Sequence, residues 1–434
     1  MDVALSYGRG KLNAALPDAN VRHVMRFQPM PAIADAREAT RLAVSDPVGC
    51  APLAQLADGR GDACIVTSDI TRPVPNEVIL PVLLGVLAGA GLSPERVTIL
   101  IGTGSHRGNT PDELREMLGD ETMDSGARIV NHDAHDPDAQ VVMGETSRGT
   151  PAHINRIYAE ADLKLAVSLV EPHLIAGFSG GRKAVCPGVC GMETLLRFHS
   201  PPLVNPDEAC AGQIHGNPAH EESLAVTRLA GAPELMVNVT LDETRRMTGV
   251  FAGELEAAHL AAAAHSYKQG RSAIDEPVDI VVTSAAGYPL DLTFYQSVKG
   301  IAGPVPIIKP GGTIIIACEC AEGIGDSPLV AALFETDKLE DYVPRVRDAA
   351  YFHMDQWYAQ FTKIRRVAGE VMVFTDGVPN DDLAKCFVTP IDSVEEGVAA
   401  ALAKHGSDAS IAVLPEGPYV LSCLAGDRVD QQQF

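Results

Sequence analysis

Short runs of β-branched and other apolar residues alternate with helix-like segments along almost the whole chain. The runs that we predict to be buried strands cover residues 63–68, 96–102, 163–170, 278–284, 313–318, 371–375 and 410–414. Between them we predict helices over residues 76–90, with Asn76 as the cap, and over 110–118 and 255–267. Alternation of this kind predicts an α/β fold with mainly parallel sheets.

The strand–helix pattern restarts near Pro277, where Val-Asp-Ile-Val-Val opens a second α/β series. We therefore predict two α/β domains, residues 1–272 and 273–434, with a final segment that can pack back on the first. The stretch 234–253 looks antiparallel and is expected to close the first domain. Because ligands of open α/β sheets bind beyond the carboxyl ends of the strands or between domains, we expect the active site in the interdomain cleft.

Composition narrows the class of protein. The chain has 434 residues, 46% of them hydrophobic and 21% charged, which is typical of a compact folded protein. Its formal charge of −23 argues against nucleic acid and anionic membranes as partners. The N-terminus lacks the pattern of a secretory signal, no segment reaches the ~20 apolar residues of a spanning helix, and the cysteines lie mostly in apolar segments as reduced thiols. These features predict a cytoplasmic protein.

Polar loops follow the predicted strands, and the first two offer a cation and a histidine. Asp69 and Arg72 follow the strand at 63–68, and an Arg fixed before Pro73 suits capture of a carboxylate or phosphate. An Asp69–Arg72 ion pair that only stabilises the turn is the structural alternative. The glycine-rich loop 102–108 carries His106 where a general acid or base would lie, although a lone loop histidine is more often a surface residue.

The third loop is the densest and runs from Glu171 to Lys183. Its Ser-Gly-Gly-Arg-Lys run lacks the spacing of a P-loop, so ATP is not implied. Lys183 precedes an apolar segment that can lower its pKa and make it nucleophilic; a glycine-rich turn with solvated cations is the alternative. His199 closes a short helix, either as a cap or as a single metal ligand. Together these loops indicate an enzyme for an anionic substrate, but they leave the reaction open.

Several of these segments together resemble the nickel-dependent lactate racemase family. The resemblance rests on Asp69-Ile-Thr-Arg72-Pro, Gly104-Ser-His106-Arg107, the block from Glu171-Pro-His173 to Gly-Gly-Arg182-Lys183, and His199, in an order and spacing that fit over about residues 5 to 425. Further on, Tyr295-Gln296-Ser-Val-Lys299-Gly and Asp355-Gln356-Trp357 are similar to motifs of the family's second domain. The third block is the most specific part of this resemblance.

The resemblance implies a cofactor and a role for each matching residue. The cofactor would be nickel held by pyridinium-3,5-bisthiocarboxylic acid mononucleotide, the nickel-pincer nucleotide, with a covalent bond to Lys183 left open. His199 would be the nickel ligand, and His106 and His173 the paired acid/base residues. Arg72, Lys299, Gln296, Tyr295 and Trp357 would bind the substrate, and Asp69, Ser179, Gly180, Gly181 and Arg182 the cofactor.

The implied reaction inverts the C2 centre of a small 2-hydroxy acid by proton-coupled hydride transfer. A histidine takes the hydroxyl proton while the Cα hydrogen leaves as hydride, and return of both to the opposite face of the planar 2-keto acid gives the other enantiomer. Leu174, Ile175 and Phe178 would favour a small side chain, as in lactate. Proteins that make or deliver the cofactor are further expected partners.

Other functions stay open at the sequence level. The same cofactor can serve a racemase or epimerase of a longer aliphatic, aromatic, malate-like or sugar acid. A non-catalytic binder of an anion or nucleotide would use the glycine-rich loops alone and has no need of paired histidines. A zinc hydrolase built from His132, His135 and Asp133 is disfavoured because their spacing matches no zinc motif.

Overall fold

The computed structural model describes residues 1–325, 334, 337–339, 359–431 and 434. Contacts divide the chain into two compact units. The N-terminal unit comprises Pro29–Phe198, Ile214–Lys268 and Gln433–Phe434. The C-terminal unit comprises Met1–Gln28, His199–Gln213 and Gln269–Gln432.

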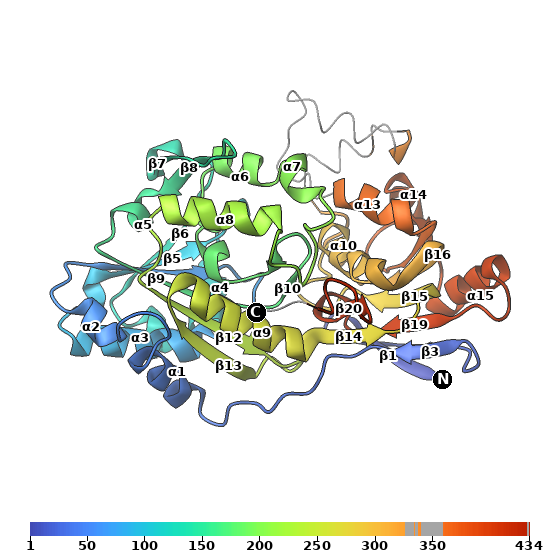
Figure 1. Ribbon diagram of the computed structural model, residues 1–434, viewed down its shortest axis with the longest axis horizontal. Helices are drawn as coiled ribbons and strands as arrows, with labels where there is room; N and C mark the ends of the chain where they lie inside the picture. Colours follow the sequence, from blue (N-terminus) through green and yellow to red (C-terminus); the bar gives the residue numbers. More distant parts are fainter. Residues whose placement is uncertain (326–333, 335–336, 340–358, 432–433) are drawn as a thin grey trace. The chain divides into compact units, whose positions relative to one another are not determined.

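A six-stranded, mainly parallel sheet forms the centre of the N-terminal unit (Figure 1). Its strands, in spatial order, are β13 (Met247–Gly253), β12 (Leu235–Leu241), β9 (Leu163–Leu169), β4 (Ala63–Ser68), β5 (Val97–Gly102) and β6 (Arg128–Asn131). Only β13 runs antiparallel to its neighbour, as predicted for 234–253. The helices of this unit are α1 (Ala36–Ser45), α2 (Leu53–Ala57), α3 (Asn76–Gly89), α4 (Pro111–Met123), α5 (Arg156–Glu160), α6 (Met192–Phe198), α8 (Pro218–Leu229) and α9 (Leu255–Gly270).

The C-terminal unit contains a second six-stranded sheet, and all its strands are parallel. In spatial order they are β18 (Thr389–Pro390), β17 (Glu370–Phe374), β16 (Ile308–Ala317), β15 (Val278–Ser284), β19 (Ile411–Leu414) and β3 (Val21–Val24). The helices are α7 (Pro201–Val204), α10 (Phe294–Ala302), α13 (Ala359–Val367), α14 (Asn380–Lys385) and α15 (Val394–His405). Short sheets complete both units: β1 (Asp2–Tyr7) with β2 (Gly10–Ala15), β7 (Gln140–Glu145) with β8 (Pro151–Asn155), β10 (Pro172–His173) with β11 (Gly177–Phe178), and β14 (Arg271–Ile274) with β20 (Leu421–Leu424).

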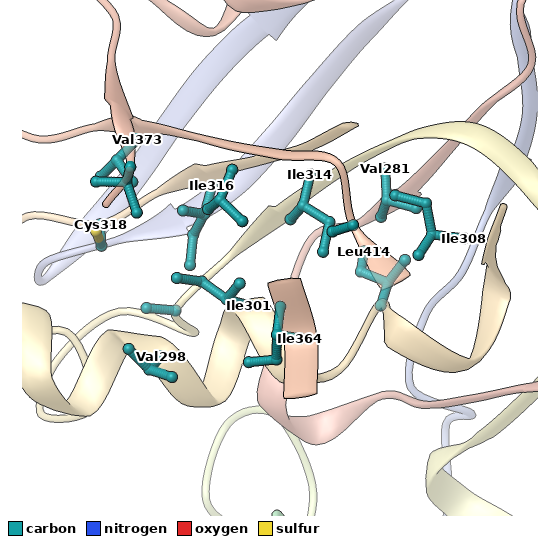
Figure 2. Packing of buried hydrophobic residues seen from close by; sticks show 14 of the residues in the cluster. Val281, Val298, Ile301, Ile308, Ile314, Ile316, Cys318, Ile364, Val373 and Leu414 are labelled. Carbon is teal, nitrogen blue, oxygen red and sulfur yellow. The ribbon is translucent and has the colours of Figure 1, made fainter. Parts of the chain in front are cut away.

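Successive side chains of β16 pack into apolar clusters on opposite faces of this second sheet. Ile314 and Ile316 belong to the same apolar cluster as Val298 and Ile301 of α10, and Figure 2 shows these side chains facing one another. Ile315 belongs to the opposite cluster, which α15 and the β1–β2 hairpin complete. Successive side chains of a strand point to opposite faces, and both faces are covered here, so the run Ile314–Ala317 is apolar without interruption.

The predicted strands are present, and the α/β class with mainly parallel sheets is confirmed. β16 begins earlier than predicted, at Ile308. The predicted cap of α3 is wrong: Pro75 holds the cap position, and the buried Asn76 side chain instead accepts a hydrogen bond of 2.8 Å from the Thr67 hydroxyl. Within the described part of the chain, none of the helices has the length and apolar character needed to cross a membrane.

The compact units assign some segments differently from the predicted division at 272/273. Met1–Gln28 groups with the C-terminal unit because β3 pairs with β19 and the β1–β2 hairpin covers the second sheet. His199–Gln213 also groups there, and α7 in this segment packs against α13. Phe434 groups with the N-terminal unit, where its ring lies 5.8 Å from that of Phe178 and 5.4 Å from that of Tyr267.

Candidate active site

Three polar loops meet at one edge of the N-terminal sheet. They follow β4, β5 and β9, which are neighbouring parallel strands, so their carboxyl ends lie side by side. One side-chain contact joins the first loop to the second, and another joins it to the third. The Gly104 amide of the second loop donates to the Gly188 carbonyl, 2.9 Å away, just beyond the third loop. The sheet thus brings together three of the polar segments that were predicted to carry the chemistry.

Asp69 connects the first loop to the catalytic candidate His106. One carboxylate oxygen of Asp69 accepts from the Thr71 amide and hydroxyl, and the other lies 2.6 Å from Nδ1 of His106. Burial acts to raise the pKa of Asp69, but the hydrogen bonds from His106 and Thr71 and the charge of Arg72 outweigh it and lower the pKa. Asp69 therefore remains ionised at neutral pH, while the His106 side chain stays 45% exposed.

Arg72 faces the third loop. Its Nε lies 3.4 Å from a carboxylate oxygen of Glu171, and both side chains are about four-fifths buried, with 20% and 17% exposed. The ion pair of Arg72 is thus formed with Glu171, and it joins the first loop to the third. It is not the Arg72–Asp69 pair of the structural alternative. Arg72 also donates from its guanidinium to the Thr71 carbonyl at 3.2 Å.

His173 lies in the short β10–β11 hairpin that opens the third loop. It pairs with Gly177 across this hairpin. The backbone amides of Ile175 and Ala176 donate to its Nδ1, at 3.3 and 3.2 Å. The ring is partly exposed, and the loop's own backbone holds it in place.

Lys183 is a partly buried amine with a low proton affinity. Burial, followed by the positive charges of Arg182 and Arg72, lowers its pKa to about 7. Its Nζ lies 5.7 Å from the centre of the Phe198 ring, and Phe198 immediately precedes His199 in the sequence. The prediction of a depressed pKa is confirmed, and the alternative of solvated cations in this turn is wrong.

Arg182 serves the interior of the N-terminal unit. Its side chain is 1% exposed, and Nη2 donates to the carbonyls of Ala176 and Phe178, at 2.6 and 3.1 Å. Nη1 lies 2.9 Å from Nε2 of His259 on α9. Burial lowers the pKa of Arg182 to about 9. These contacts clamp the loop between His173 and Lys183, whereas the family resemblance implies a cofactor-binding role for Arg182.

The neighbouring predicted cofactor residues are also packed into the fold. The Ser179 hydroxyl donates to the Leu169 carbonyl at 2.8 Å. Gly180 and Gly181 have φ of +70° and +54°, and a Cβ on either would lie 2.6 Å from a side-chain atom, of Val170 or of His259. The run therefore needs glycine for its own turn, and this turn sets the position of Lys183.

The remaining predicted residues belong to the C-terminal unit. His199 follows directly after α6 and is partly buried. Gln296 and Lys299 lie on one face of α10, where the Lys299 amine donates to the Gln296 side chain at 2.6 Å. Tyr295 is partly buried and packs against the core of this unit. Trp357 lies outside the described residues.

Two functional candidates were not predicted from the sequence. Glu171 belongs to the third loop and carries a negative charge, whereas Arg72 at the end of a neighbouring strand carries a positive one. This pairing of charges was a signal in the sequence that the two side chains contact each other. His259 gave no such signal, because only the fold brings α9 against the third loop. Both residues support the loops that carry the predicted reactive groups.

The geometry disfavours the zinc alternative. His132 is 1% exposed, and its nitrogens lie 2.9 Å from the Cys190 carbonyl and 2.9 Å from the Asn155 side chain. Among the described residues, no group of three or more His, Cys, Asp or Glu side chains is arranged to hold a metal ion. His132 is thus part of the packing of its loop.

Comparisons with known proteins agree over almost the whole chain. Residues 7–211 match the lactate racemase N-terminal domain, and residues 274–422 match the lactate racemase C-terminal domain. The chain is 32% identical to lactate racemase from Thermoanaerobacterium thermosaccharolyticum over 97% of its own length and 99% of that protein's. It is also 32% identical to lactate racemase from Lactiplantibacillus plantarum, over 88% and 89% of the respective lengths.

Solved structures show the same relationship. The lactate racemase apoprotein from T. thermosaccharolyticum superimposes with a TM-score of 0.91 at 31% identity, covering 97% of this chain and all of that one (100%). A protein from Thermotoga maritima, at 19% identity and a TM-score of 0.68, covers 90% of this chain and 97% of its own and shares the fold.

The fold and the sequence relationships define an α/β isomerase of the racemase type. The chain belongs to the lactate racemase family.

Proposed function

We propose that this racemase inverts the C2 centre of a small 2-hydroxy acid, with lactate as the first candidate. One observation carries the proposal: His106, His173 and Arg72 stand on three joined loops at the carboxyl edge of one sheet. A carboxylate substrate needs a cation to hold it, and inversion needs a proton acceptor for each enantiomer. The curated relatives at 32% identity are both lactate racemases.

In this proposal Arg72 binds the substrate carboxylate. Glu171 already orients the Arg72 guanidinium, leaving further donors for a bidentate contact. His106 removes the hydroxyl proton of one enantiomer and His173 that of the other. The imidazole group suits this task because histidine in general changes its protonation state close to neutral pH.

The residues present fit the nickel-pincer nucleotide. With a pKa of about 7, a large fraction of Lys183 is a neutral amine at neutral pH, and such an amine can condense with a thiocarboxylic acid to form a thioamide with loss of water. His199 offers a single imidazole, which suits a nickel ion that brings its own soft donors. When bound, the cofactor supplies an acceptor for the Cα hydrogen as hydride. Lys183 and His199 would hold it, and the Arg182 clamp would fix the loop.

The three apolar residues of the third loop bear on the side chain that the substrate carries at C2. Ile175 and Phe178 are 3% and 0% exposed, so both serve the core and neither offers surface to a ligand. Leu174 is partly exposed and is the remaining apolar candidate of the three. Lactate is therefore proposed from the two lactate racemase relatives, with Leu174 as the apolar residue that can contact its methyl group.

Optical inversion tests the proposal directly. Protein produced together with the cofactor-synthesis proteins and nickel is incubated with single enantiomers of lactate, a longer aliphatic acid, an aromatic acid, malate and a sugar acid. We expect lactate to lose its optical rotation fastest and to approach a racemic mixture from either side. Faster inversion of another acid would replace lactate as the substrate, and no inversion of any acid would contradict the proposed reaction.

A further inference from the structure

We propose that the two catalytic histidines rest in opposite tautomers, and that Asp69 is the positioning residue which sets this for His106. The inference rests on the proposed function and deepens it, because it gives His106 and His173 unequal starting roles. It also reassigns Asp69, which the family resemblance placed with the cofactor. All the contacts involved lie within the N-terminal unit.

The environment of His106 fixes a proton on Nδ1. Its partner at 2.6 Å is a carboxylate oxygen, which can only accept a hydrogen bond while ionised. Asp69 is ionised because its pKa lies below the ordinary value, and its other oxygen is already held by Thr71. Neutral His106 therefore carries its hydrogen on Nδ1 and its lone pair on Nε2. It rests as a proton acceptor at Nε2.

The environment of His173 fixes the reverse arrangement. Two backbone amides, of Ile175 and Ala176, point their hydrogens at Nδ1. Backbone amides are always donors, so Nδ1 must present a lone pair to them. Neutral His173 therefore carries its hydrogen on Nε2. It rests as a hydrogen-bond donor at Nε2.

The difference predicts unequal handling of the two enantiomers. A hydroxyl group that reaches Nε2 of His106 meets a lone pair and can lose its proton at once. A hydroxyl group that reaches Nε2 of His173 meets an N–H, so this ring must first release the two amides and move its hydrogen to Nδ1. Because enantiomers have equal free energies, kcat/KM must be the same in both directions. The two enantiomers should therefore differ in kcat and in KM, while their kcat/KM values stay equal.

Nitrogen-15 spectroscopy of the imidazole rings tests the tautomers without any turnover. The full chain is labelled at histidine and observed near pH 8, above the ordinary histidine pKa of ~6.5. His106→Gln and His173→Gln variants assign the two rings by loss of their signals. We expect a protonated Nδ1 and bare Nε2 in His106, and the reverse in His173. The same tautomer in both rings would overturn the inference.

Substitution of Asp69 supplies the second measurement. Asp69→Asn can turn its amide NH₂ toward Nδ1, so the His106 signals should shift toward the other tautomer. kcat/KM for the preferred acid should then fall by about 10²- to 10⁴-fold, the usual contribution of a general base. Thr71→Val is the matched control, because it removes a bond to the same carboxylate but leaves the contact with His106. It should keep the tautomer and lose less than about tenfold in rate.

The outcomes separate this inference from the proposed function. Opposite tautomers in a protein that inverts no 2-hydroxy acid would leave the assignment of Asp69 intact and refute the reaction. Rapid inversion in a protein whose rings share one tautomer would refute only the inference. An unchanged His106 spectrum in Asp69→Asn, with a rate within about twofold of the parent, would show that Asp69 does not position the ring.

Discussion

Burial decides the chemistry of Lys183 more than its sequence neighbours do. The amine lies beside the Phe198 ring and near two guanidinium groups, those of Arg182 and Arg72, and it lacks the solvation of a surface lysine. A lysine side chain in water has a pKa of about 10.4, so only roughly one amine in 2,500 is neutral at pH 7. With a pKa of about 7, about half of the Lys183 amines are neutral there.

This difference can be measured by chemical acylation across pH. In protein made without the cofactor-synthesis proteins, we expect Lys183 to react with acetic anhydride with a midpoint near pH 7, because deprotonation of a lysine proceeds as pH rises through its pKa. Lys385 is the internal control, since its hydrogen bond to the Asp382 carboxylate raises its pKa. Arg72→Gln should raise the Lys183 midpoint by removing a positive charge. Equal midpoints for both lysines would contradict the assignment.

His199 is the second residue whose role depends on its surroundings. The sequence left it as either a helix cap or a metal ligand, and the fold places it directly after the ring that contacts Lys183. We expect His199→Ala to lose nickel from the cofactor-loaded protein when metal content is measured after gel filtration. His135→Ala, at an exposed loop position, should retain it. Full nickel occupancy in His199→Ala would remove this ligand role, and zinc in place of nickel in active protein would revive a hydrolase.

At the scale of elements, the apolar pattern located the strands well because each is a continuous buried run between turn residues. The strands at 63–68 and 278–284 match β4 and β15 at both ends. The pattern also placed the loops at the strand ends, and hence the candidate residues. The pattern did not indicate which residues the side chains of those loops contact. The pair of Arg72 with Glu171 and the contact of Arg182 with His259 join residues far apart in the chain, and only the packed sheet and helices bring them together.

The tight turn after Lys183 gives a test of loop packing. A Cβ on Gly188 would lie 2.2 Å from the Ala184 carbonyl oxygen, a backbone atom that cannot move without displacing the turn. Gly188→Ala should therefore destabilise the protein by roughly 1–3 kcal/mol and weaken the contact of its carbonyl with Gly104. Gly85→Ala is the matched control, because Gly85 is exposed within α3 and meets nothing within 4 Å. It should stabilise the protein by up to about 1 kcal/mol. Thermal unfolding of both variants decides the sign.

At the scale of the whole molecule, the sequence predicted two α/β bodies but not the route of the chain between them. Pairing of β3 with β19 is a long-range contact that no local pattern encodes, so the predicted boundary leaves Met1–Gln28 in the first domain. The same holds for His199–Gln213, which follows α6 without a break in composition. The residues alone indicated an enzyme that acts on an anionic substrate. The reaction itself came from the family resemblance.

In the proposed reaction, His106 and His173 share the inversion of one substrate. The most direct test is the initial rate of optical inversion of each lactate enantiomer by cofactor-loaded protein carrying His106→Ala or His173→Ala, with nickel content and thermal unfolding measured on the same samples. We expect each variant to keep its nickel and its fold and to lose about 10²- to 10⁴-fold in kcat/KM. Inversion at the parent rate in both variants would contradict the assignment of these histidines.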